Sequence, residues 1–88
     1  MNEMNEINKL EENLKKMKFI FELYHLATEH FKKQDYHGAK LLNYMASEQI
    51  LQNYDNYSEK YKKVFEFALE NSIILDEKLN KIINPLLN

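Results

Sequence analysis

Residues that interrupt helices are almost absent from this chain. Among its 88 residues there is one glycine, Gly38, and one proline, Pro85. Glycine permits left-handed backbone and proline fixes φ, so a chain with one of each forms few tight turns. At 44% hydrophobic and 30% charged residues, the chain has enough apolar surface for a folded core. We therefore predict an all-α protein with a single domain over residues 1–88.

The first third of the chain has the pattern of one long amphipathic helix. Apolar and aromatic residues recur at steps of three and four from Ile7 to Phe31, the spacing that places side chains in one stripe. The stripe is narrow before about residue 18, and from Phe19 onward a second apolar side joins it. The narrow part predicts pairing with one further helix, in this chain or another, and the broad part predicts core. We expect a helix over about residues 3–33, with spacing that is also typical of a coiled coil.

Two short segments predict the turns. Asp35 has the side chain of an N-cap residue, so we expect a second helix over about residues 36–53. A glycine inside a helix costs roughly 1 kcal/mol relative to alanine. We therefore expect a packing reason for Gly38 in the first turn, namely close approach of the preceding helix. The stretch NYDNYS (53–58) predicts the second turn. A third helical region follows over about residues 58–83 and forms one helix or two. Together these segments predict an antiparallel bundle of three or four helices.

Part of the chain resembles a known helical hairpin. The resemblance rests on a large–small pair in the first helix, an acidic–aromatic pair at the turn and two alanines seven residues apart: Leu26-Ala27, Asp35-Tyr36, Ala39 and Ala46. In these positions the chain resembles one tetratricopeptide-type hairpin, although Gln34 stands where that family has a turn glycine and no second copy follows. A single hairpin followed by one more helix is also similar to microtubule-interacting-and-transport domains, which bind partner helices in grooves. This second resemblance implies a helical protein-binding module.

The basic residues disfavour recognition of nucleic acid. All 12 of them are lysine, and the net charge is −2. Bidentate contacts to guanine and phosphate depend mainly on arginine, and a negative net charge opposes binding to a polyanion. A lysine-based nucleic-acid binder is therefore kept only as an alternative, with these contact residues: Lys9, Lys15, Lys16, Lys18, Lys32 and Lys33.

Patterns that carry chemistry are weak in this sequence. The chain has no cysteine and no glycine-rich phosphate loop. Glu22 and His25 have the spacing of one di-iron ligand pair, but such a site needs a second pair on a facing helix. The longest apolar run is SIIL, far below the roughly 18 residues of a membrane span, and the N-terminus is unlike a signal peptide. We predict a cytoplasmic protein that is not an enzyme and uses no cofactor, no metal and no membrane.

Two groups of residues are candidates for protein contacts. Tyrosine is enriched at interfaces because it presents apolar area with a polar tip. Half-buried core rings are the simpler interpretation for most of the tyrosines, and for those of residues 54–61 the two interpretations stand level. The candidates for partner binding are Tyr54, Tyr57 and Tyr61, and those for self-association are Leu10, Leu14 and Met17.

We predict a small non-enzymatic protein–protein interaction module. The abundance of asparagine, isoleucine, lysine and tyrosine is typical of A/T-rich genomes and favours a phage- or plasmid-encoded inhibitor or adaptor that binds a host protein. The alternative is a structural homodimer that forms through the N-terminal helix.

Overall fold

The computed structural model describes residues 2–85, and these residues form three α-helices. They are α1 (Asn2–Lys32), α2 (Tyr36–Gln52) and α3 (Glu59–Ile83), with a short 3-10 turn, η1 (Tyr54–Asn56), between α2 and α3. No strand occurs in residues 2–85, which confirms the prediction of an all-α protein. The third helical region is one continuous helix.

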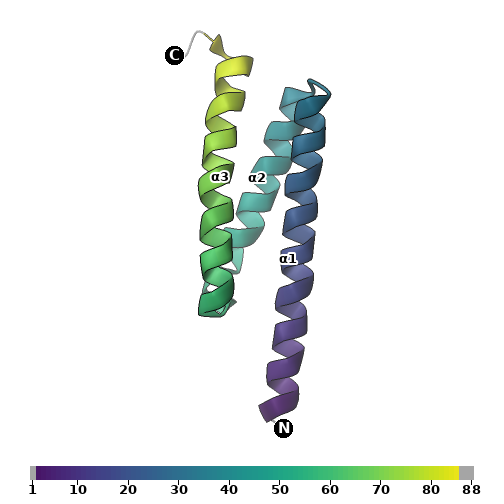
Figure 1. Ribbon diagram of the computed structural model, residues 1–88, viewed down its shortest axis with the longest axis vertical. Helices are drawn as coiled ribbons and strands as arrows, with labels where there is room; N and C mark the ends of the chain where they lie inside the picture. Colours follow the sequence, from purple (N-terminus) through teal and green to yellow (C-terminus); the bar gives the residue numbers. More distant parts are fainter. Residues whose placement is uncertain (1, 86–88) are drawn as a thin grey trace.

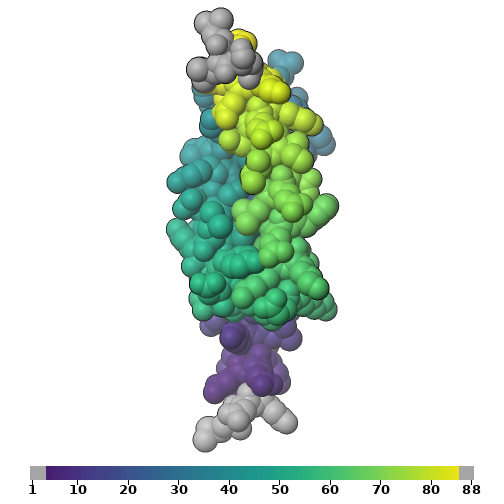
Figure 2. Space-filling view, turned by 90° about the vertical axis from the view of Figure 1, so that its left-hand side faces the viewer, coloured from purple at the N-terminus to yellow at the C-terminus, as the bar shows by residue number. Residues whose placement is uncertain are grey.

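The helix α2 packs against both of the other helices, and Figure 1 shows it behind the gap between α1 and α3. At about 1.5 Å per residue, the 31 residues of α1 span about 46 Å, whereas the 17 residues of α2 span about 26 Å. The N-terminal part of α1 therefore continues beyond the end of the other two helices, as Figure 2 shows in purple. The result is an elongated molecule of 57 × 22 × 15 Å.

The end of α1 is a Schellman motif, in which two backbone amides turn back to the last carbonyls of the helix. The amide of Asp35 donates to the carbonyl of His30 at 2.8 Å, and the amide of Gln34 donates to the carbonyl of Phe31 at 3.0 Å. Gln34 has a φ of 66°, the left-handed conformation that glycine usually supplies at this position. The chain therefore makes a tight turn here without using its single glycine.

The single glycine instead makes room for the cap of α2. One carboxylate oxygen of Asp35 accepts from the amide of Gly38 at 3.1 Å, and the other lies 2.7 Å from Nδ1 of His30. The hydrogen bond from His30, followed by that from Gly38, holds the pKa of Asp35 below its usual value. A Cβ on residue 38 would lie 2.8 Å from Cγ of Asp35 and 3.0 Å from Nδ1 of His30. Gly38 is thus required by the capping carboxylate and the histidine ring that braces it.

The core follows the length of α2. Its buried apolar members are Ile20, Leu23 and Ala27 from α1, Ala39, Ala46 and Ile50 from α2, Tyr57 from the loop, and Phe65, Ala68 and Leu79 from α3. Phe65 is fully buried, with the rings of Phe21 and Tyr57 at 6.4 and 4.5 Å from its own. Burying one such ring contributes about 1.5–3 kcal/mol. The alanines of α2 allow its two neighbours to approach it closely.

Candidate functional site

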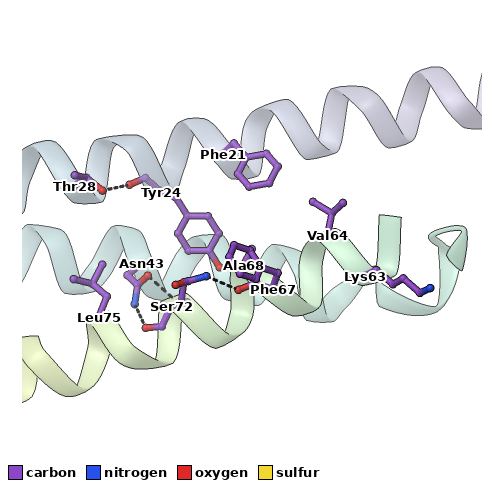
Figure 3. Close-up of a pocket in the computed structure, with 11 residues that line it drawn as sticks. Phe21, Tyr24, Thr28, Asn43, Lys63, Val64, Phe67, Ala68, Ser72 and Leu75 are labelled. Carbon is purple, nitrogen blue, oxygen red and sulfur yellow. Dashed lines mark hydrogen bonds between the residues drawn. The ribbon is translucent and has the colours of Figure 1, made fainter. Parts of the chain in front are cut away.

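An apolar groove runs between α1 and α3, with α2 at its floor (Figure 3). Its volume is about 540 Å³, within the range of roughly 300–1,000 Å³ that is usual for binding pockets. The side chains that form its two walls are Phe21, Tyr24 and Thr28 from α1, and Val64, Phe67, Ala68 and Leu75 from α3. Because both walls belong to helices that pack on α2, the groove is a fixed feature of the fold.

The floor of the groove is a chain of hydrogen bonds that joins all three helices. Nδ2 of Asn43 donates to the carbonyl of Ser72 at 3.0 Å, and the hydroxyl of Ser72 donates to Oδ1 of Asn43 at 2.9 Å. The hydroxyl of Ser47 lies 2.6 Å from that of Ser72 and 3.2 Å from that of Tyr24. Asn43 is only 2% exposed, so these polar groups are paired with each other, as burial requires. The network fixes Tyr24 against the floor.

The same network explains why α3 does not end at Asn71-Ser72. Serine and asparagine inside a helix compete for backbone hydrogen bonds and favour helix ends. Here the hydroxyl of Ser72 is engaged by α2, and Nδ2 of Asn71 donates to the carbonyl of Phe67, one turn earlier, at 2.9 Å. Both polar side chains are satisfied within the helical conformation, so α3 continues to Ile83.

Apolar side chains remain exposed along the groove and beyond it. Phe67 on the α3 wall is 69% exposed, and Val64 and Phe21 are exposed beside it. On α1 the exposed apolar stripe continues through Leu14 and Ile7 toward the N-terminus. Monomeric proteins seldom leave contiguous apolar surface uncovered unless it binds something. The groove and this stripe are therefore the candidate site.

The groove carries little charge. Among the described residues that line it, Lys63 is the one charged side chain. The hydroxyls of Ser47 and Ser72 bond to each other and to Asn43, so neither is paired with a histidine that would activate it. Within residues 2–85 no three histidine or acidic side chains gather as a metal site would need. This chemistry suits an apolar occupant with few polar groups.

The predicted tyrosine cluster lies at the α2–α3 junction, away from the groove. Tyr57 is 4% exposed and packs on Phe65, and burial raises the pKa of its hydroxyl. Tyr54 and Tyr61 are half-buried against the same core. The hydroxyl of Tyr54 donates to Glu66, and this hydrogen bond raises the pKa of Tyr54. Burial withdraws Tyr57 from the surface, and partner binding by this cluster stays a prediction.

The residues predicted for self-association divide between surface and core. Leu10 is 48% exposed and Leu14 is 44% exposed, whereas Met17 packs partly buried against the core. All three follow the stripe that leads along α1 into the groove wall at Phe21. The structure therefore makes Leu10 and Leu14 available to another chain, and their role in self-association stays a prediction.

Comparisons of the chain with protein-family models, with curated proteins and with solved structures gave no match. The resemblance of residues 26–48 to tetratricopeptide-type and microtubule-interacting-and-transport domains stays a prediction. None of the helices in residues 2–85 combines the length and the apolar character needed to cross a membrane.

Proposed function

We propose that the chain is a protein-interaction module whose groove between α1 and α3 receives one amphipathic helix of a protein partner. The observation that carries this proposal is that α2 packs on both neighbours while the apolar walls of α1 and α3 stay open opposite it. Three helices in this antiparallel arrangement leave the fourth position of a four-helix bundle empty. A helix is about 10–12 Å across with its side chains, which suits the space between two such walls.

The length of the groove sets the length of the occupant. From Lys63 to Leu75 the α3 wall covers about 18 Å at 1.5 Å per residue, which is three to four helical turns. Helices that bind in grooves use apolar anchors at positions i, i+3 or i+4, and i+7. We expect three or four such anchors, with an acidic residue beside Lys63. A module of this size acts as an adaptor or as an inhibitor by covering a helix that its partner uses elsewhere.

A peptide-display selection tests the proposal. Helical 16-residue peptides are selected on the immobilised chain at nanomolar concentration, and their dissociation constants are measured by fluorescence anisotropy. We expect selected peptides to share the apolar spacing of a groove-binding helix. Phe67→Asp should weaken binding at least tenfold, because it places a charge on the most exposed ring of the groove.

The matched control is Leu41→Asp, which changes an apolar residue of α2 that is 60% exposed and lies outside the groove. Circular dichroism is used to check that both variants keep their helices. If Leu41→Asp weakens binding as much as Phe67→Asp does, or if no peptide with this spacing is selected, the groove is not a helix-binding site.

A further inference from the structure

We propose that the helix in the groove is the N-terminal part of α1, residues 4–14, from a second copy of this chain. Two chains then form an antiparallel dimer in which each covers the groove of the other. This inference rests on the proposed helix-binding function and names its partner. It is carried by the exposed stripe of α1, by the dimensions of the groove and by the order of charges along α1.

The stripe of α1 links the exposed segment to the groove wall on the same helix. Every side chain from Met4 to Glu12 is exposed. The N-terminal end of α1 extends beyond α2 and α3 (Figure 2), and Lys9 and Leu10 lie beside the α2–α3 loop. Ile7 and Leu14 lie at heptad spacing with Phe21, which forms part of the groove wall. When two such helices pair in opposite directions, the exposed segment of each one lies on the groove wall of the other.

The dimensions of the segment and the groove agree. From Met4 to Leu14 a helix covers about 15 Å, against about 18 Å for the α3 wall. Pairing Leu14 with Met17 of the second copy brings Ile7 beside Tyr24 and Leu10 beside Phe21 of that copy. Leu14 and Phe21 are exposed along the seam, whereas Met17 and Tyr24 pack against the core, so the second copy meets only the uncovered sides of these two residues.

Charges select the antiparallel direction. In the register above, Glu11 flanks the seam opposite Lys18 of the second copy, and two-fold symmetry forms this pair twice. A parallel pairing of the same stripe would instead place Glu6 opposite Glu11 of the second copy. Residues 4–14 also contain three glutamates and one lysine, whereas the charged residue that lines the groove is Lys63.

The test is the molar mass of the full chain by light scattering over a range of concentrations. We expect a dimer at micromolar concentration that Glu11→Lys and Lys18→Glu each weaken at least tenfold. The double variant should restore it, because the exchanged charges attract again. Glu12→Lys makes the same charge change on the outer side of α1 and should leave the dimer unchanged. Phe67→Asp should dissociate it, since the groove is the receiving surface.

A strict monomer at all concentrations overturns the inference, as does a dimer that Glu11→Lys or Phe67→Asp leaves intact. These failures differ from failure of the proposed function. A monomer that still binds selected peptides through Phe67 keeps the helix-binding function and loses only the second copy as partner. A chain that neither dimerises nor binds such peptides loses both.

Discussion

Replacing Asn43 separates the hydrogen-bonding role of the groove floor from simple packing. In Asn43→Ala the two hydrogen bonds to Ser72 are lost, at 3.0 and 2.9 Å. Ser72 keeps a partner, because its hydroxyl also lies 2.6 Å from that of Ser47 and its carbonyl belongs to the helical backbone of α3. Each hydrogen bond is worth about 0.5–1.5 kcal/mol net. The expected loss of unfolding free energy is therefore about 1–3 kcal/mol, with little dependence on pH.

Asn43→Asp keeps the shape of the side chain and reverses one interaction. A carboxylate oxygen replaces Nδ2 and faces the carbonyl oxygen of Ser72, at a site that is 2% exposed. Burial and this repulsion raise the pKa of the new carboxyl in the folded state above the roughly 3.9 of an unfolded chain. Between the two pKa values the folded state binds more protons, so stability rises as the pH falls. For a shift of about two units the gain is about 2.7 kcal/mol.

The assay is urea unfolding followed by circular dichroism at 222 nm, at several pH values between 4 and 7.5. Protein concentration is held fixed, because self-association would also change the apparent stability. Relative to the natural chain, Asn43→Asp should recover stability as the pH falls, and Asn43→Ala should not. If the Asp variant follows the pH profile of the natural chain, residue 43 does not donate to the carbonyl of Ser72 and our account of the groove floor is wrong.

Three further substitutions test the turns and the core. Gln34→Gly should stabilise the fold by about 1 kcal/mol and raise the Tm by roughly 4–8 °C in calorimetry, because residue 34 has a left-handed backbone; a lower Tm would contradict the turn geometry. Tyr57→Phe should leave urea stability unchanged or raise it by about 1 kcal/mol, because the hydroxyl is buried with no hydrogen-bond partner among the described residues; a marked loss would mean that the hydroxyl is bonded. Asp35→Asn should lower the Tm at pH 7. In the natural chain the lowered pKa of Asp35 gives stability that is present above about pH 4 and lost as the pH falls further, and the variant should lack that acid-dependent loss.

The helices could be predicted from the sequence because interruptions to the helical pattern are so few. Asp35 marked the start of α2 through its capping side chain, and the structure shows that cap on the amide of Gly38. The sequence predicted only that Gly38 has a packing reason. The hydrogen bond between Asp35 and His30, which leaves no room for a Cβ on residue 38, depends on how the turn folds. The continuity of α3 could not be predicted from Asn71-Ser72, because the partner that satisfies Ser72 comes from α2 and not from neighbouring residues.

The groove could not be predicted because its walls have the same composition as a core. Val64 and Phe67 lie among buried residues in the sequence, one position from Phe65 and Ala68. Their spacing marks a second apolar face of α3, which one packed neighbour cannot cover. The groove could have been found by asking how many faces of α3 are apolar, in addition to how many apolar residues the helix contains. For the tyrosine cluster, composition suggested a surface, whereas contact with Phe65 shows that at least Tyr57 serves the core.

The length of α1 connects the fold to the proposed dimer. Lys16 of α1 donates to Asn53 at the end of α2, and Asn13, one turn earlier, is the first buried residue of α1 among those described. An isolated helix of fewer than about 12–15 residues is marginal in water, and residues 4–12 are exposed at every position. Their helix therefore depends on continuation from the packed part of α1, and it gains stability wherever its apolar side is covered. The groove of a second copy offers such a cover of matching length, and the segment in turn covers Phe67 and the walls around it. In the proposed dimer, one antiparallel contact would bury the groove and the N-terminal stripe together.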